Sequence, residues 1–103
     1  MTNQAVLNQM REVYGEKSRC YDFRSDEWVS RKDAYAIMKQ AVPRGYNEFK
    51  AELVLDFPDD VMFQLAREGS VCMYVKGDNL PSREDLNADE YTIENGVTRV
   101  WWD

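Results

Sequence analysis

The chain has 103 residues, and its 19 acidic and 13 basic side chains give it a formal charge of −6. A chain of this length can bury one small core but not two, so we expect residues 1–103 to form a single domain. Its 44 % of hydrophobic residues excludes a disordered chain, and with no membrane-spanning run and no signal-peptide pattern we expect a cytoplasmic protein.

The first predicted element is a helix over residues 3–14. Apolar residues recur there at helical spacing, and these are Val6, Met10 and Val13. Gly15 follows as a helix stop. The next stretch, residues 16–29, is harder to assign, and within it residues 20–24 fit either a short strand or an ordered loop.

A second helix is expected to begin after Ser30. The Ser30 side chain can cap this helix together with Asp33, and Val29 can pack against Ala34 across the cap. Pro43 forces the chain out of the helix near residue 41. The expected buried stripe consists of Ala34, Ile37, Met38 and Ala41.

The middle of the chain predicts a strand and then a third helix. Apolar residues alternate with charged ones over residues 49–57, which favours a half-buried strand although the residue types also suit a helix. Pro58 followed by two acids suits a helix start, and Gly69 would close that helix. Its buried stripe would consist of Val61, Met62, Leu65 and Ala66.

The C-terminal third predicts β-structure. Residues 70–76 are nearly apolar on both faces and rich in β-formers, which is typical of an interior strand. Residues 82–86 fit one helical turn capped by Ser82 and Asp85. Two further strands flank the pair Asn95-Gly96, which predicts a hairpin with a type I′ turn.

The register of this hairpin sorts its side chains onto two faces. Ile93 opposes Thr98 and Tyr91 opposes Val100, so these four share one face with Trp102, which we expect in the core. The other face carries Thr92, Glu94, Val97, Arg99 and Trp101. The fold class is therefore α+β, with an antiparallel sheet of about four strands, two to three helices packed on one face and a C-terminal β-hairpin.

The absence of histidine and the small number of cysteines limit the kinds of catalysis and metal binding that the chain can perform. The chain has no histidine, so it lacks the commonest general base and the commonest transition-metal ligand. Its two cysteines, Cys20 and Cys72, are far apart and are expected to be inert thiols rather than a disulfide or zinc ligands. We therefore expect no cofactor, no metal and no enzyme activity, although chemistry by a pair of carboxylates stays open. The pair Asp59-Asp60 also fits a divalent-metal site, but helix-start acids explain it better.

Charge is distributed unevenly along the chain. Residues 1–45 hold eight basic and six acidic groups, whereas residues 46–103 hold five basic and thirteen acidic groups. A solvated surface accounts for this imbalance, and so does an acidic face that meets a basic surface of another protein. The candidate residues for that face are Asp56, Asp59, Asp60, Asp78, Glu84, Asp85, Asp89, Glu90 and Glu94. Arg99 and Trp101 share the other hairpin face as a typical interface pair, and Trp101 and the neighbourhood of Tyr91 are the expected packed anchor.

Two rival interpretations involve other surfaces. The first 45 residues interleave basic and aromatic side chains, as in single-strand nucleic-acid binding, and the two helices expected there could also form a divergent helix-turn-helix. These are Arg11, Lys17, Arg19, Arg24, Arg31, Lys32, Lys39 and Arg44 with Tyr14, Tyr21, Phe23 and Trp28. In addition, the hairpin edge and Trp101 could pair two copies of the chain.

The overall profile is that of a short, acidic, histidine-free α+β protein without an active-site constellation. It is similar to the profile of small inhibitors that act by docking, such as phage-encoded anti-CRISPR or anti-restriction proteins and toxin-immunity proteins, and the similarity covers composition rather than specific residues. The leading hypothesis is a protein that blocks a partner's nucleic-acid-binding surface without itself contacting nucleic acid or membrane. The alternatives are a toxin-immunity protein and a nucleic-acid-binding regulator that uses the N-terminal half.

Overall fold

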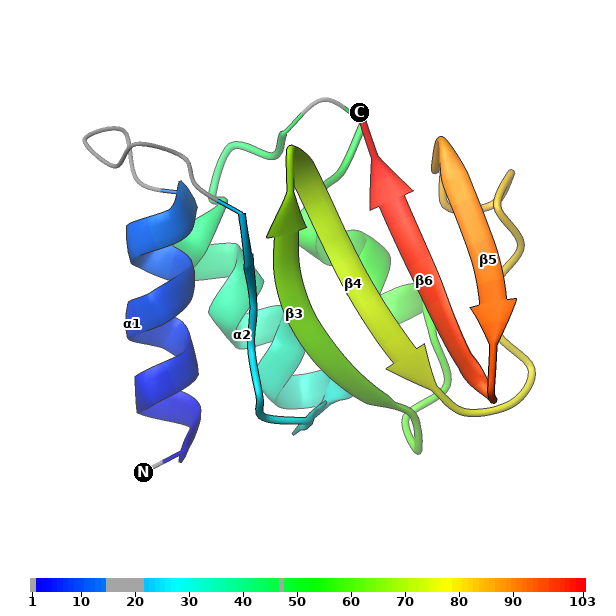
Figure 1. Cartoon of the computed structure of the whole chain (residues 1–103), viewed down its shortest axis with the longest axis horizontal. Helices are drawn as coiled ribbons and strands as arrows, with labels where there is room; N and C mark the ends of the chain where they lie inside the picture. The colour runs from blue at the N-terminus through cyan, green and yellow to red at the C-terminus, as the bar shows by residue number, and fades with distance from the viewer. Residues whose placement is uncertain (1, 15–21, 47) are drawn as a thin grey trace.

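In the part of the chain that the structure describes, six antiparallel strands form one sheet, and three helices accompany it (Figure 1). A computed structural model describes residues 2–14, 22–46 and 48–103 of the chain. The elements in chain order are α1 (Thr2–Tyr14), β1 (Phe23–Arg24), β2 (Val29–Ser30), α2 (Arg31–Ala41), the 3-10 helix η1 (Ala51–Asp56), β3 (Met62–Glu68), β4 (Ser70–Lys76), β5 (Glu90–Glu94) and β6 (Val97–Trp102).

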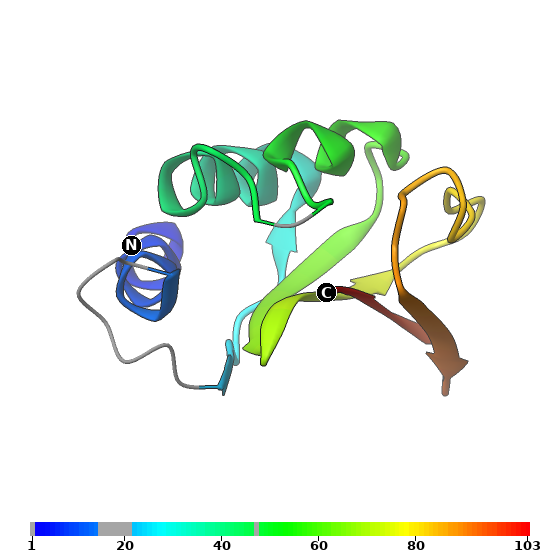
Figure 2. The ribbon, with the colours of Figure 1, turned by 90° about the horizontal axis from the view of Figure 1, so that it is seen from above.

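The strands lie side by side in the order β1-β3-β4-β6-β5, and β2 pairs with the start of β3. Helices α2 and η1 cover one face of the sheet, and α1 lies beside α2 near the β1 edge (Figure 2). Within the described ranges no helix covers the opposite face, which we call the open face. None of these described helices is long and apolar enough to cross a membrane.

The core lies between the sheet and the α2–η1 layer, and Trp102 is its largest side chain. Trp102 is fully buried, and its ring meets that of Phe49 edge-on with 4.9 Å between centroids. Its indole N–H donates to the Leu86 carbonyl oxygen at 2.8 Å, which ties the loop before β5 to the core. The expectation that Trp102 is a core residue is confirmed.

The capped helix and the hairpin are also confirmed. Ser30 accepts a hydrogen bond from the Asp33 backbone N–H at 3.2 Å, as an N-cap should, and α2 buries the expected stripe. In the hairpin, Ile93 pairs with Thr98 and Tyr91 with Val100. Asn95 and Gly96 both have positive φ, which a type I′ turn requires.

The strand expected over residues 49–57 is wrong. Residues Ala51–Asp56 form the 3-10 helix η1, and the buried residues Ala51, Val54 and Phe57 recur every three positions, which is the period of that helix. The alternation of apolar and charged residues in the sequence does not match the pattern of burial, because Leu55, which was expected to be buried, is 43 % exposed. The helix-forming preference of Ala, Glu and Leu decides the local structure here.

The helix expected after Pro58 is wrong as well, because this segment enters strand β3. Residues 63–67 are all buried, so both faces of β3 are covered, and β3 pairs residue by residue with β4 as an interior strand does. Gly69, expected to end a helix, instead connects β3 to β4 with a φ of +74°, between the paired residues Glu68 and Ser70. Strand β4, which lies between β3 and β6, is interior as expected.

Two short strands raise the strand number above the expected four. Residues Phe23–Arg24 form β1 and Val29–Ser30 form β2, and both pair with β3. Of residues 20–24, which fitted either a strand or a loop, the last two therefore form a strand. Gly15 and Cys20 lie outside the described residues.

Candidate functional site

The carboxylates singled out from the sequence are all exposed, and they lie at the end of η1, on the loops before β3 and after β4 at the lower end of the sheet, and on β5 and the loop that leads into it (Figure 1). We call this surface the acidic flank. Across residues 56–60 and 77–95, which carry it, Arg83 is the single basic residue. The acidic flank consists of Asp56, Asp59, Asp60, Asp78, Glu84, Asp85, Asp89, Glu90 and Glu94.

Strand pairing brings distant parts of the acidic flank together. At the lower end of the sheet, Met62 pairs with Lys76, Lys76 with Val97, and Val97 with Glu94. The loop after β4 also packs on the loop before β3, because a Cβ added at Gly77 would lie only 2.4 Å from the Val61 side chain. Asp78 therefore lies beside the Asp59-Asp60 turn, although some 20 residues separate them.

The remaining acids lie on the loop that leads into β5. Ser82 and Asp85 exchange side chain to backbone hydrogen bonds of 3.1 and 3.3 Å, which confirms the expected cap of a single helical turn. The Tyr91 hydroxyl donates to the Pro81 carbonyl oxygen at 2.9 Å, and Trp102 holds the Leu86 carbonyl. These bonds fix the backbone that carries Glu84, Asp85 and Asp89.

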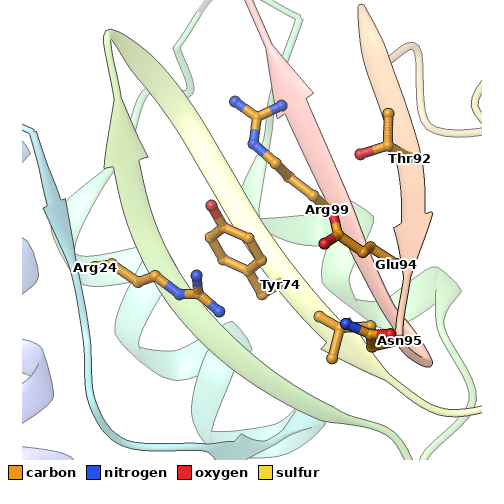
Figure 3. Close-up of a pocket in the computed structure, with 7 residues that line it drawn as sticks. Arg24, Tyr74, Thr92, Glu94, Asn95 and Arg99 are labelled. Carbon is orange, nitrogen blue, oxygen red and sulfur yellow. The ribbon is translucent and has the colours of Figure 1, made fainter.

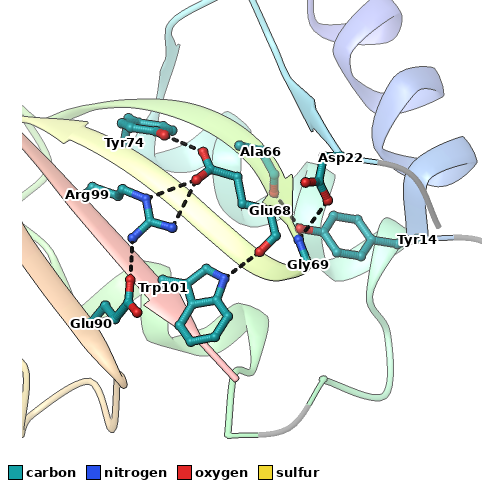
Figure 4. A network of polar contacts seen from close by, with 9 residues as sticks. All are labelled: Tyr14, Asp22, Ala66, Glu68, Gly69, Tyr74, Glu90, Arg99 and Trp101. Atoms are coloured by element: carbon teal, nitrogen blue, oxygen red, sulfur yellow. Dashed lines mark hydrogen bonds and ion pairs between the residues drawn. The ribbon is translucent and has the colours of Figure 1, made fainter.

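A polar network on the open face joins the acidic flank to the centre of the sheet (Figure 4). The Arg99 guanidinium donates to Glu90 at 2.8 Å and to Glu68 at 2.9 and 3.1 Å, and the Tyr74 hydroxyl also donates to Glu68. Burial alone would raise the Glu68 pKa, but these hydrogen bonds and the Arg99 charge outweigh it and lower the pKa. Glu68 is thus held as a carboxylate.

Trp101 is half-buried beside this network rather than free on the surface. Its indole N–H donates to the Glu68 carbonyl oxygen at 2.7 Å, so its polar edge already has a partner within the protein. Arg99, expected beside Trp101 at the interface, is likewise engaged by Glu68 and Glu90. Both residues therefore support the hairpin, and what remains exposed is mainly carboxylate.

A hollow of about 400 Å³ lies on the open face next to β5 (Figure 3). Tyr74 borders it on one side, and the Arg24 guanidinium stacks on the Tyr74 ring at 3.6 Å from the centroid. On the other side Glu94 points from β5 into the hollow. Glu94 has no hydrogen-bond or ion-pair partner among the residues that the structure describes.

The basic residues of the first 45 positions do not gather into one such surface where they are described. Arg11 donates to Gln40, Arg31 to the Phe57 carbonyl oxygen and Lys39 to Glu52, at three separate places. Lys17, Arg19 and Tyr21 lie outside the described residues. Arg24 stacks on Tyr74, and Lys76 lies over the Trp28 ring at 4.2 Å, so the basic and aromatic contacts described for this half involve the sheet, and the nucleic-acid alternative stays a prediction.

The thiol of Cys72 and the phenol of Tyr74 are held in their neutral forms, because their pKa values are raised. Burial and the Glu68 charge raise the Cys72 pKa to about 12, and burial with the Glu68 hydrogen bond raises the Tyr74 pKa to about 12. Cys72 is fully buried as a free thiol. No group of three or more acidic or cysteine side chains within the described ranges could hold a metal ion, so Asp59 and Asp60 form no such site there.

Comparison with known proteins identifies no relative: no protein family, no curated protein and no solved structure matches the chain. Function must therefore be argued from the surface itself. Sequence reasoning overlooked Glu68 and Tyr74, which organise Arg99 and so the hairpin. The sequence does contain a sign of this contact. Successive side chains of a strand point to opposite faces, so the pairing of β4 with β6 places Tyr74 opposite Arg99 on the open face.

Proposed function

We propose that the protein acts by binding alone, docking its acidic flank on a basic surface of a partner protein and blocking it. The observation that carries this proposal is the concentration of nine exposed carboxylates along one side of a small domain, where they outnumber the neighbouring basic residues Arg83, Lys76 and Arg99. Such a surface can take the place of nucleic-acid phosphates on lysine and arginine side chains. A partner that binds nucleic acid, as in anti-CRISPR and anti-restriction systems, is the class that this chemistry fits best.

The anchoring of the acidic flank supports the same proposal. Glu90 is held by Arg99, and the loop that carries Glu84 and Asp85 is held by Trp102 and Tyr91. A preorganised array of charges loses little conformational entropy on binding and accelerates association with an oppositely charged surface. A toxin-immunity protein would use the same surface on a basic toxin, so identification of the partner separates these two cases.

The test is capture of a partner by the immobilised protein from an extract of the organism that carries the gene. Retention is compared from about 50 to about 500 mM NaCl, a range over which the Debye length falls severalfold. A variant with Asp59→Asn, Asp60→Asn and Glu94→Gln removes three charges from the acidic flank. The matched control, Glu12→Gln with Asp26→Asn and Glu27→Gln, removes three exposed charges that are not part of the acidic flank.

We expect a partner whose retention falls with salt, is lost in the flank variant and persists in the control. The captured protein should also release labelled nucleic acid when the wild-type chain is added. Equal retention by the two variants, or a partner that keeps its nucleic acid in the presence of the chain, would contradict the proposal. A gel shift of nucleic acid by the chain alone would instead support the nucleic-acid-binding alternative.

A further inference from the structure

We propose that the free edge of β5 binds an extended segment of the partner as an additional antiparallel strand, in which two basic side chains four residues apart face Glu90 and Glu94. This inference rests on the proposed function and specifies the kind of segment that the partner contributes. It follows from the position of β5, from its backbone and from the side chains on its two faces.

Strand β5 is the edge of the sheet on the side of the acidic flank. It pairs with β6 only, whereas the other edge of the sheet is formed by the short strands β1 and β2 near α1 (Figure 1). Four of its five residues are exposed, and only Tyr91 is half-buried. Ile93 is 70 % exposed, more than any other large hydrophobic side chain in the described ranges.

The hairpin register determines which backbone groups this edge offers. Glu94 and Val97 flank the two-residue turn and pair with each other, and hydrogen-bonded pairs then recur at every second residue along an antiparallel ladder. The N–H and C=O groups of residues 90, 92 and 94 are therefore directed toward β6. Those of Tyr91 and Ile93 are directed away from the sheet, where an added strand would bond to them.

The side chains of β5 define the pattern of the incoming strand. Glu90, Thr92 and Glu94 lie on the open face, while Tyr91 and Ile93 lie on the helix side, so a complementary strand alternates basic or polar with apolar residues. A lysine or arginine opposite Glu94 would pair with a carboxylate that has no partner among the residues that the structure describes. An apolar residue opposite Ile93 would cover the exposed side chain.

Charge argues against a second copy of the chain as the occupant. In the antiparallel register that pairs all five residues of two β5 strands, Glu90 of each copy would face Glu94 of the other, and like charges directly opposite are destabilising. Charged residues on an edge strand are also a common protection against self-association. The same two carboxylates attract a strand that brings basic residues to those positions.

The probe is a capped synthetic peptide with the central sequence Lys-Val-Thr-Val-Lys, titrated into the ¹⁵N-labelled protein. One control peptide, Val-Lys-Thr-Lys-Val, has the same composition and charge, but its lysines are two residues apart and cannot face both glutamates. A second control carries N-methyl groups on both valines, which removes the N–H groups that would bond to Tyr91 and Ile93. We expect the first peptide to bind at least fivefold more tightly than either control and to slow amide hydrogen exchange at Tyr91 and Ile93.

Protein variants test the same contact from the other side. Glu94→Gln should weaken binding of the peptide about two- to fivefold, the range expected for one cross-strand charge pair. Asp59→Asn removes a charge from the acidic flank away from β5 and should change binding less. Ile93→Pro removes an outward N–H and should abolish binding; circular dichroism and the exchange of Val100 and Met73 amides report whether the sheet persists.

The results separate this inference from the proposed function. Equal binding of the three peptides, no binding of any, or unchanged exchange at Tyr91 and Ile93 would refute strand addition. A partner captured through the acidic flank would in that case leave the proposed function intact. A dimer of the free protein in sedimentation that Ile93→Pro dissociates would also refute the inference, because β5 would then be occupied by a second copy.

Discussion

Replacement of Trp102 by phenylalanine tests whether the core anchors the acidic loop before β5. Trp102 is fully buried, and its indole N–H bonds to the Leu86 carbonyl oxygen, on a residue that is itself fully buried. Phenylalanine keeps a ring against Phe49 but removes both the donor and part of the volume. The substitution should therefore destabilise the fold and loosen residues 82–88 in particular.

The magnitude follows from two contributions. Phenylalanine lacks the five-membered ring of the indole, which leaves a cavity on the order of 35 Å³, and at about 24 cal/mol per Å³ this cavity costs about 0.8 kcal/mol. Leaving the Leu86 carbonyl oxygen buried without its donor costs about 1–2 kcal/mol more. The total of about 2–3 kcal/mol corresponds to a fall in Tm of roughly 8–20 °C for a domain of this size.

The matched control is the same substitution at Trp101, whose indole N–H also donates to a backbone carbonyl, that of Glu68. Because Trp101 is only half-buried, water can replace its donor, and we expect a cost of about 1 kcal/mol or less. Urea unfolding gives both free energies, and amide hydrogen exchange at Leu86 and Ala88 reports the loop. Equal costs for the two variants, or exchange at these amides unchanged by Trp102→Phe, would show that the core does not anchor the loop.

Four further outcomes are expected. Ser30→Ala removes the cap that holds the Asp33 amide and should cost about 1 kcal/mol in urea unfolding, with α2 losing helicity first. The folded state lowers the pKa of Glu68, so the ionised carboxylate contributes its full stabilisation above about pH 4.3, and this contribution is lost as the pH falls through the folded-state pKa. The difference in unfolding free energy between wild type and Glu68→Gln should therefore shrink as the pH is lowered below about 4.3. In a Cys20→Ser background, Cys72 should resist iodoacetamide at pH 8 until the chain unfolds, and prompt labelling of the native protein would contradict its burial. Added salt should raise the urea midpoint, because it screens a net charge of −6, while it weakens partner retention.

Local signals with a stereochemical cause were read correctly from the sequence. The Asn95-Gly96 pair fixes a turn with two positive φ values, and that turn sets the hairpin register. Ser30 caps α2 through a bond to a residue three positions away, so no tertiary information was needed. In both cases the residues that decide the structure are neighbours in the chain.

The two wrong secondary-structure predictions concern short apolar stretches that fit both the period of a strand and the period of a helix. Ala51, Leu53 and Leu55 alternate, but the residues that are buried, Ala51 and Val54, are three apart, and only the packing of η1 on α2 reveals this. The segment from Val61 to Leu65 contains both spacings at once. Its pairing with β4, a contact that the sequence does not encode locally, selects the strand.

The candidate site shows the same division. The carboxylates were identifiable from composition alone, but their gathering depends on the packing of Gly77 on Val61 and on the pairing of Glu94 with Val97. The engagement of Trp101 and Arg99 within the protein depends on Glu68, which lies more than 30 residues away in the chain. A sequence can therefore nominate charged residues for an interface, while the tertiary structure decides which of them remain available.

The solvent exposure of these carboxylates also explains why the fold tolerates so many like charges. Repulsion between exposed carboxylates is weak in water and screened within about 8–10 Å at moderate salt, so their accumulation costs much less than it would in the core. The hydrogen bonds from Trp102 and Tyr91 hold the loop against that repulsion, and they use groups of the core and of β5. One side of the sheet thus supplies the packing that stabilises the domain, whereas its lower end and β5 edge carry exposed carboxylates, of which Glu90 is neutralised within the protein by Arg99.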